Sequence, residues 1–583
     1  MTSPTTTHSG KPIIHSEFKT LCDGLDYAAK CETGFNFYNG KAVLKTAVPY
    51  SVIRDRAIEA AKGLVKYAEK DARVGIAAVT SEDFAVLFFA CQYAGLVPAP
   101  LPLPVTLGGR GSYERQLQRM AATGDFHALF TPASMEGIMS SALNDLNVPV
   151  LTFEDVFALP KGDSLRPHGE DDLCYIQYSS GSSSSPKGVL GTQKSVTANC
   201  HGITRHGMNI VDGDRATTWL PMYHDMGLIG CMLAPMMSQI SVDYLDPHDF
   251  TRRPMSWLQL ISDNKGTLSY SPTFGYELCV KRWKNDRELD LSSWRGAGIG
   301  GDMVRPEPLT DFANTFADMG FKEGSFKPSY GLAETTLAAT FAPMGQGLKK
   351  HTIDMARYER TSEAVEASDL TPAEHQRTFV ACGYTLPDHE IEVRAIEGDV
   401  LGEKKVGQIF IKGPSVSPGY FQNKQATEAS FSKDGWLNSG DLGYWLDEQL
   451  VVTGRFKDLI LYHGRNIWPQ DIEWAAQAAA PHRCGRACSF SYGGVGDEKQ
   501  IMLLLECRTR DPKLLDEIYT AVSAAIRLEV GVPVQLTLVP RSTMIITSSG
   551  KLSRARVKEK YANGEIIDML ADSPVKIVKS DAS

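Results

Sequence analysis

Residues 177–189 form the segment of this sequence whose composition is best suited to chemistry: a loop with Gly181, a run of serines, Pro186 and Lys187. The backbone N–H groups and hydroxyls of such a loop can surround a polyphosphate, and the lysine adds a point charge. The pattern differs from the P-loop of NTPases, G-x-x-x-x-G-K-[ST], because Pro186 replaces the second glycine and Gly188 the final hydroxyl residue. A serine-rich surface linker is the alternative for a loop of this composition.

Further blocks along the chain combine turn residues with aromatic and charged side chains. In the first, a proline and a glycine bracket a Tyr-His-Asp sequence centred on His224, which predicts a turn that opens a helix. Residues 298–304 follow, where clustered glycines allow a flat ring to approach the main chain closely. Residues 330–336 then place a tyrosine close to the carboxylate of Glu334. Each block alone is weak, since a single histidine or acidic residue is more often structural than functional.

Alternating helix and strand patterns must position these blocks. Residues 54–70 and 81–95 are predicted to be helical, the second with Ser81 as its N-cap. Residues 73–79 and 173–176 are predicted strands, and the latter leads directly into the serine-rich loop. Strands that alternate with helices indicate an α/β fold with parallel or mixed sheets covered by helices.

A chain of 583 residues exceeds what one hydrophobic core normally organises, so at least two domains are expected. The pattern changes near Gly454, after which short strands and helices are interleaved. We therefore predict a large α/β domain at 1–454 and a small α+β domain at 455–583. The predicted elements of the small domain are strands at 459–462, 501–506 and 535–538 and a helix at 512–528.

The charge and the cysteine content exclude several classes of protein. With 60 basic and 69 acidic residues the net charge is −9, which offers no general attraction to nucleic acid. We find no signal sequence within residues 1–15, and the longest apolar run, 84–105, contains four prolines, so no membrane span is expected. The 11 cysteines lack paired C-x-x-C spacing, and Cys484 and Cys488 are predicted to share a helical face. Reduced thiols indicate a cytoplasmic protein.

At least six motifs, in order along almost the whole chain, resemble those of the adenylate-forming enzymes, the superfamily of acyl-CoA synthetases, adenylation domains and luciferases. The resemblance is closest to the fatty acyl-AMP ligases. The serine-rich loop resembles the family's phosphate loop, Y-T-S-G-S-T-G-x-P-K-G, although Ser184 replaces its second glycine and loses some backbone freedom. The last motif, around Lys551, is similar to the loop that carries the family's mobile catalytic lysine.

The resemblance implies ATP and Mg²⁺ as cofactors and a fatty or related carboxylic acid as substrate. Lys551, His224 and Glu334 are the implied catalytic residues, and Glu334 is also the implied Mg²⁺ ligand, since hard oxygen ligands suit that ion. Asp441 is expected to accept hydrogen bonds from the ribose hydroxyls. The residues implied to bind the nucleotide are Ser180, Gly181, Ser182, Ser183, Lys187, Gly300, Gly301, Asp302, Tyr330, Gly331, Leu332, Ala333, Asp441 and Arg455.

The implied reaction has two steps: a carboxylate attacks the α-phosphorus of ATP to give an acyl-adenylate, and the acyl group then passes to a thiol. Between the steps the small domain is expected to swing about a hinge. Gly383 lies 49 residues after Glu334, a longer spacing than in CoA ligases or luciferases. The added segment, residues 349–377, resembles the insertion of fatty acyl-AMP ligases, which packs between the domains and hinders CoA use. The expected acceptor is therefore an acyl carrier protein.

Alternatives to this interpretation stay open. Residues 349–377 could be a surface loop without consequence, and the protein an acyl-CoA synthetase that uses free CoA. Ser184 is the feature that favours a non-catalytic adenylate-binding homologue. An amino-acid adenylation domain fits less well, because the Tyr-His-Asp block resembles that of acyl ligases. Phe274, Tyr276 and Leu278 are candidates for the acyl pocket, although aromatic residues at this spacing are more often core.

Overall fold

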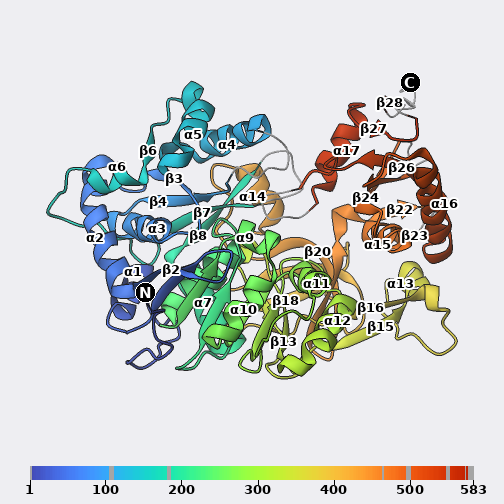
Figure 1. The fold of residues 1–583 in the computed structure, drawn as a ribbon, viewed down its shortest axis with the longest axis horizontal. Coiled ribbons are helices and arrows are strands. Elements are labelled where there is room, and N and C mark those ends of the chain that lie inside the picture. The colour runs from blue at the N-terminus through green and yellow to red at the C-terminus, as the bar shows by residue number, and fades with distance from the viewer. Residues whose placement is uncertain are drawn as a thin grey trace.

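The computed structural model describes residues 3–103, 110–179, 186–462, 465–493, 500–546, 552–571 and 573–574. Figure 1 shows a large body that contains the N-terminus and a smaller body formed by the C-terminal part of the chain. The fold belongs to the α/β class, with parallel and mixed sheets covered by helices, which confirms the predicted class. The exact domain boundary at 454/455 stays a prediction; strand β21 (Gln449–Arg455) runs across this position.

A nine-stranded sheet forms the centre of the large body, in the order β17-β14-β13-β12-β11-β9-β10-β1-β2. The inner neighbours from β13 to β1 pair in parallel, and β2, β14 and β17 pair antiparallel at the edges. The strands are β1 (Gly34–Tyr38), β2 (Leu44–Pro49), β9 (Arg215–Thr218), β10 (Ser241–Leu245), β11 (Leu268–Ser271), β12 (Gly296–Ile299), β13 (Phe326–Tyr330), β14 (Thr340–Phe341) and β17 (Tyr384–Thr385). The α-helices between them are α7 (Gln193–His201), α8 (Ala234–Met237), α9 (Pro247–Arg252), α10 (Met255–Asn264), α11 (Thr273–Arg282) and α12 (Pro306–Phe316).

A buried ion pair joins β9 to β10 inside this sheet. The Nε and Nη2 atoms of Arg215 each donate to one carboxylate oxygen of Asp243 at 2.7 Å. The side-chain amides of Asn36 and Asn264 donate to the same carboxylate, each at 2.9 Å. Burying a charge is costly unless it is paired and hydrogen-bonded, and these four donors meet that requirement.

A second sheet of the large body is parallel and four-stranded, in the order β4-β3-β5-β6. Its helix α3 (Glu82–Ala94) is buried along nearly its whole length, and Ser81 accepts the Phe84 N–H at 3.3 Å, which confirms the predicted N-cap. Pro98 and Pro100 of the apolar run fall on the edge strand β4, where a missing N–H is tolerated. The elements are α1 (Leu21–Ala28), α2 (Tyr50–Tyr67), β3 (Arg73–Ala77), β4 (Val97–Leu101), α4 (Arg110–Gly124), β5 (Phe126–Thr131), α5 (Glu136–Leu143), β6 (Val150–Thr152) and α6 (Phe153–Ala158).

Residues 349–377 contribute to a core and are not a surface loop. They contain β15, α13 and the first two residues of β16, and β15 pairs antiparallel with β16. Ile353 and Tyr358 are 0% and 3% exposed and belong to one apolar cluster with Tyr444 and Trp468. The other strands and α-helices of the large body are β7 (Leu173–Ser179), β8 (Lys187–Thr192), β15 (Lys350–Asp354), α13 (Met355–Thr361), β16 (Gln376–Val380), β18 (Glu390–Arg394), β19 (Gly407–Lys412), α14 (Lys424–Ser430), β20 (Leu437–Leu446) and β21.

The small body has a three-stranded sheet, β24-β25-β26, with apolar clusters of its own. Cys484 and Cys488 lie on strand β24, so the prediction that they share a helical face is wrong. A spacing of four residues fits the period of a strand as well as that of a helix, and pairing with β25 decides the outcome. The elements are β22 (Ile460–Tyr462), β23 (Arg465–Ile467), α15 (Pro469–Ala479), β24 (Cys484–Tyr492), β25 (Gln500–Cys507), α16 (Pro512–Glu529), β26 (Gln535–Pro540), α17 (Arg554–Ala562), β27 (Ile567–Asp568) and β28 (Ser573–Pro574).

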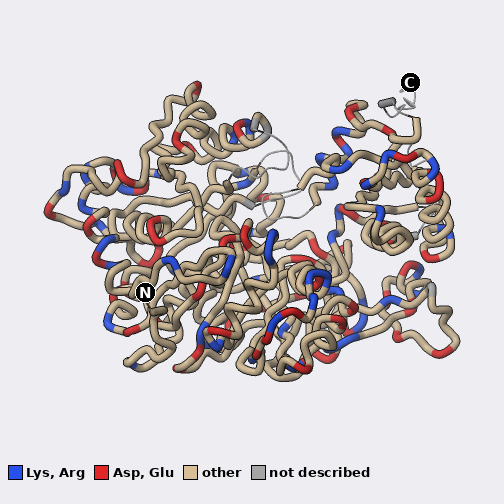
Figure 2. The backbone as a smooth tube through the Cα atoms, viewed as in Figure 1, with Lys and Arg blue, Asp and Glu red and all other residues tan. Residues whose placement is uncertain are grey.

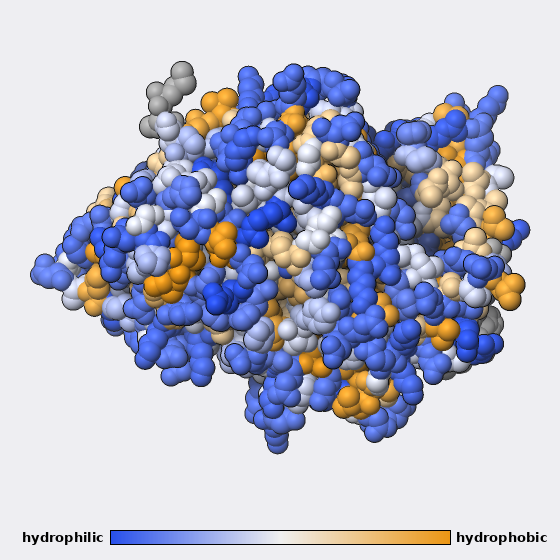
Figure 3. All heavy atoms as spheres, turned by 90° about the horizontal axis from the view of Figure 1, so that it is seen from below, coloured by the Kyte–Doolittle hydropathy of each residue, from blue (hydrophilic) through white to orange (hydrophobic). Residues whose placement is uncertain are grey.

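The surface shows both signs of charge. Figure 2 shows acidic and basic residues interspersed over both bodies. The face in Figure 3 is mostly hydrophilic, with hydrophobic residues in separate small patches. Within the described ranges no helix has the length and apolar character needed to cross a membrane. All 11 cysteines are buried free thiols.

Lys327 on β13 gives the stability of the large body a predictable pH dependence. Its side chain is buried, and this burial lowers its pKa to about 8 from 10.5. Between these two pH values the unfolded chain binds more protons than the folded one, so the free energy of unfolding should rise with pH, by up to about 3 kcal/mol. Urea unfolding of wild type and Lys327→Met at pH 8 and pH 10 tests this. An identical pH response in both proteins would contradict it.

Candidate functional site

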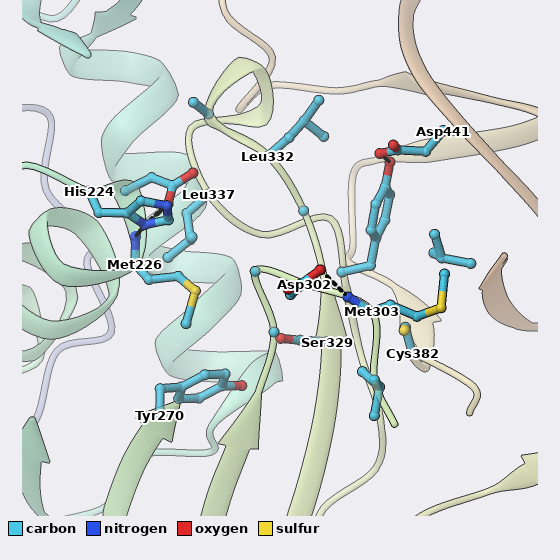
Figure 4. A pocket seen from close by; sticks show the side chains of 18 of the residues that line it. His224, Met226, Tyr270, Asp302, Met303, Ser329, Leu332, Leu337, Cys382 and Asp441 are labelled. Atoms are coloured by element: carbon cyan, nitrogen blue, oxygen red, sulfur yellow. Dashed lines mark hydrogen bonds and ion pairs between the residues drawn. The ribbon is translucent and has the colours of Figure 1, made fainter. Parts of the chain in front are cut away.

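A cavity of about 1360 Å³ lies where the large body faces the small one. Its walls include Lys187 and Tyr420 from the large body and Glu473 and Arg554 from the small body. In Figure 4, His224 and Asp441 lie on opposite sides of the cavity, and Tyr270 and Ser329 lie below them in this view. The cavity therefore brings together segments that are far apart in the sequence.

Most of the residues singled out in the sequence converge on this cavity. Ser180, Gly181, Ser182, Ser183 and Lys551 lie outside the described residues. The remaining predicted residues all line the cavity: Lys187, His224, Gly300, Gly301, Asp302, Tyr330, Gly331, Leu332, Ala333, Glu334, Asp441 and Arg455.

Tyr420 connects the lysine that follows the serine-rich loop to the acidic residue of the fourth block. The Nζ atom of Lys187 lies 4.6 Å from the centroid of the Tyr420 ring, within the range of a cation–π contact. The Tyr420 hydroxyl donates to Oε1 of Glu334 at 2.8 Å. Burial raises the pKa of Tyr420, so the hydroxyl stays a donor at neutral pH. This side chain thus orients both charged groups toward one space.

The position of Tyr420 follows from backbone pairing. Its segment forms a bridge to β8 at Val189, and the Phe421 N–H donates to the Gly188 carbonyl at 2.8 Å. Tyr420 is not among the residues predicted from the sequence. The sequence shows a Pro-Gly turn directly before two aromatic residues at 418–421, which indicates a turn. It does not show that Tyr420 contacts Glu334, which lies 86 positions earlier in the chain.

A second group is centred on Asp441. The Tyr330 hydroxyl donates to Asp441 Oδ2 at 2.8 Å, and Arg455 Nε lies 3.3 Å from Oδ1. Asp441 on β20 and Arg455 on β21 are cross-strand partners, which explains their proximity. The charge of Asp441 is the main cause of a raised Arg455 pKa. The carboxylate is thereby held in one orientation at the cavity wall.

His224 lies at the start of an unusual helical segment. Its Nδ1 atom is 2.6 Å from Oδ1 of Asp225. The Met226 N–H lies 2.7 Å from the same oxygen and 3.3 Å from His224 Nδ1, so Asp225 is the closer acceptor. Residues Met226–Leu233 form a π-helix, which confirms a turn that opens a helix, in a wider form than expected. Such π-helical turns are rare and occur frequently at functional sites.

One part of the cavity, called the apolar arm below, is lined by residues of the π-helical segments and of the nine-stranded sheet. A second π-helix, Gly202–Gly207, contributes Ile203 to its wall. The side chains along the arm are predominantly apolar, and an extended hydrocarbon fits such a space. The residues of this arm are Ile203, Met208, Ile210, Ala216, Cys231, Ala234, Pro235, Ile240, Leu268, Tyr270 and Phe341.

The suggested acyl-pocket residues on α11 do not line this arm. Tyr276 is fully buried, and its hydroxyl donates to the Gly298 carbonyl at 2.9 Å. Phe274 is 41% exposed, and Leu278 packs against the apolar cluster around Trp257. The core interpretation is therefore right for Tyr276 and Leu278. Helix α11 contacts β11 and, through the Tyr276 hydroxyl, β12. Sequence hydropathy alone does not distinguish a residue of this core from a residue of the cavity wall.

The acidic side chains that line the cavity offer few ligands for the expected Mg²⁺ ion. Within the described part of the chain, His, Cys, Asp and Glu side chains form no group of three or more that could hold an ion. Glu334 lines the cavity, and one of its oxygens accepts the Tyr420 hydroxyl. Magnesium is commonly held by one or two carboxylates together with the phosphates of the substrate. A single carboxylate, that of Glu334, is consistent with that mode of binding.

The fold and this cavity define an ATP-dependent ligase that forms AMP, built from a large and a small domain. The model of the family described as AMP-binding enzyme matches residues 39–421. The chain belongs to this family, and its resemblance to fatty acyl-AMP ligases is confirmed.

Individual relatives cover nearly the whole chain. A putative acyl-CoA synthetase from Caulobacter vibrioides is 43% identical over 96% of this chain and 98% of its own length. The medium-chain-fatty-acid–[acyl-carrier-protein] ligase JamA from Moorena producens is 30% identical over 94% of this chain and 96% of its own. A solved chain from a study of fatty acyl-adenylate ligases from E. coli and L. pneumophila is 41% identical, covers 95% of this chain and 100% of that chain, and superimposes with a TM-score of 0.91.

Replacing Tyr420 tests the link between Lys187 and Glu334. In Tyr420→Phe the ring remains under the ammonium group, but the hydrogen bond to the carboxylate is lost. We expect kcat/KM for ATP to fall about tenfold, the usual effect of losing a hydrogen bond to a charged group. Tyr444→Phe is the matched control, because its hydroxyl contacts His351 and does not line the cavity. Unchanged kinetics in Tyr420→Phe would contradict the assignment.

Proposed function

We propose that this ligase activates a fatty acid with ATP, giving a fatty acyl-adenylate and pyrophosphate. The observation that carries the proposal is that one cavity combines the apolar arm with polar groups, among them His224 and Asp441. A fatty acid has this division, an apolar chain and a carboxylate. The names of the relatives, which include a fatty-acid ligase and fatty acyl-adenylate ligases, support the same substrate class.

In the proposed first step, a carboxylate oxygen forms a bond to the α-phosphorus as the bond to the pyrophosphate oxygen breaks. Both reactants are anions, so the site must supply positive charge and donors. Lys187 contributes charge from the large domain, and Lys551 is proposed to contribute it from the small domain. The carboxylate is ionised at neutral pH, so no general base is needed. Attacking and leaving oxygens are expected to be in line, as in phosphoryl transfer.

The other predicted residues receive roles in binding. Asp441 is proposed to accept both ribose hydroxyls, and Arg455 to contact ribose and phosphate. Tyr330 and the glycines at 300 and 301 are proposed to enclose the adenine. Glu334 and the phosphates would hold Mg²⁺, whose chemistry would be to neutralise developing charge on the phosphate oxygens. His224 is proposed to contact the substrate carboxylate.

Pyrophosphate exchange that depends on a fatty acid tests this function. We expect exchange in wild type and a loss of at least about 100-fold in Lys551→Ala, the scale for removing one group that stabilises a transition state. Lys513→Ala, an exposed lysine of the same domain, is the control and should be unaffected. A protein that binds adenylates without catalysis would give no exchange with any acid. Near-normal exchange in Lys551→Ala would remove that residue from the proposed mechanism.

For the second step we propose that the acyl group passes to the phosphopantetheine thiol of an acyl carrier protein. The support is the segment 349–377, whose last residue contacts both domains. Arg377 Nη1 lies 2.6 Å from Asp471 Oδ2 on α15, and its guanidinium lies 5.4 Å from the Trp474 ring centroid. On the large-domain side, Arg377 Nη2 lies 3.4 Å from the Met303 sulfur.

These contacts restrain the small domain at the side of α15. Free CoA and a carrier protein present the thiol on the same phosphopantetheine arm, but in CoA this arm is attached to a nucleotide and in the carrier to a folded protein. The second candidate is an acyl-CoA synthetase, which the name of the Caulobacter relative favours. The two candidates share the adenylation step and differ in the acceptor.

The substitution Arg377→Met tests which candidate is right. Deleting residues 349–377 would remove Ile353 and Tyr358 from an apolar core and destabilise the protein, whereas Arg377→Met leaves this core intact. We expect adenylation to change less than about threefold, because Arg377 is outside the cavity wall, and the yield of CoA thioester to rise. Thioester formation with CoA and with a phosphopantetheinylated carrier protein is measured in parallel. Arg394→Met is the control, because Arg394 pairs with Glu392 within the large domain. If wild type already prefers CoA to the carrier, the carrier proposal is wrong.

A further inference from the structure

Phe341, the second residue of the short strand β14, contributes to the walls of two cavities. The first is the large cavity with the apolar arm, and the second has a volume of about 290 Å³. Among the described residues, Phe341 alone lines both. Its side chain is 8% exposed, so the ring occupies the space that separates them.

Different residues hold the ring on its two sides. On the side of the apolar arm, the Tyr270 ring meets it edge-on, with centroids 6.4 Å apart. On the side of the second cavity, the Lys327 Nζ lies 5.7 Å from the ring centroid. Gly207, at the end of the π-helix, approaches so closely that a Cβ there would lie 2.8 Å from the ring. The position of the ring is thus determined by packing from both directions.

The second cavity can receive the end of a hydrocarbon chain. Met344, Leu386 and Pro387 give it apolar walls, and Tyr384, 43% exposed, places one side of it at the protein surface. The Lys327 amine donates to the Ala342 carbonyl, which satisfies one of its hydrogens within the protein. The cavity is therefore additional space that only the Phe341 ring, among the described residues, shares with the cavity of the apolar arm.

We infer that Phe341 closes the inner end of the acyl arm and sets the upper limit of acyl-chain length, with the second cavity as the space a longer chain would enter. The inference rests on the proposed fatty-acid substrate. Chains shorter than the limit gain from each buried methylene group, about fourfold in kcat/KM. A chain beyond the limit meets the ring and loses this gain.

Two substitutions should move the limit in opposite directions. Phe341→Ala joins the two cavities, so acids longer than the wild-type limit should gain at least tenfold in relative kcat/KM. Gly207→Ala adds a methyl group on the far side of the ring and pushes it into the arm, so the limit should shorten. Pyrophosphate exchange with straight-chain acids from hexanoic to docosanoic acid measures both shifts. The KM for ATP should stay at the wild-type value in each variant.

Phe326→Ala is the control for a general effect of removing a buried ring. Phe326 is 0% exposed, lies on β13 beside Lys327, and lines neither cavity, so its loss should leave the length profile unchanged. If Phe341→Ala is too unstable, Phe341→Leu and Gly207→Ala provide the same comparison. If the folded variants keep the wild-type limit of acyl-chain length, the role of Phe341 is overturned but the proposed function is not. Absence of exchange with every acid in wild type overturns the proposed function, and this inference with it.

Discussion

The cavity depends on one face of strand β12 that carries no side chains. Gly296, Gly298 and Gly300 alternate at this position, and residues two apart point to the same side of a strand. A Cβ on Gly298 would lie 2.1 Å from the Tyr270 ring, and one on Gly296 would lie 2.9 Å from both Leu268 and Met208. Tyr270, Leu268 and Met208 all line the cavity. Any side chain on this face of β12 would push them into the space that a ligand needs.

The same region joins the polar and apolar parts of the site. Gly301 directly follows, with φ of +79°, a conformation that L side chains rarely adopt, and a Cβ there would lie 2.6 Å from the Met226 sulfur. The π-helix that begins at Met226 can therefore approach the glycine loop, with His224 on the preceding turn. Gly301 and Met226 both line the cavity, so this contact fixes the position of the glycine loop relative to the π-helical wall.

Sequence patterns predicted the fold class and many residues of the candidate site because several motifs, such as those of His224 and Tyr330, lie at the start of a helical segment or at the end of a strand. His224, Glu334 and Asp441 line one cavity as expected, although they lie far apart in the sequence. Tyr420 and Phe341 were not predicted, because both act through partners far along the chain and carry no distinctive local pattern. The helical assignment of Cys484 and Cys488 failed for a related reason: β-pairing with residues 500–507 outweighs a local period that fits either structure.

Arg455 is the last residue of β21, and the η9 turn (Phe456–Asp458) follows at once on the way to the small domain. The side chain that approaches Asp441 is therefore attached to the stretch of backbone that leads from the large body to the small one. A rotation that starts at this turn cannot leave the Arg455 guanidinium unaffected. Were the small body to rotate about this turn, a ligand that holds Arg455 against Asp441 would bias the angle between the two bodies through the backbone that joins them.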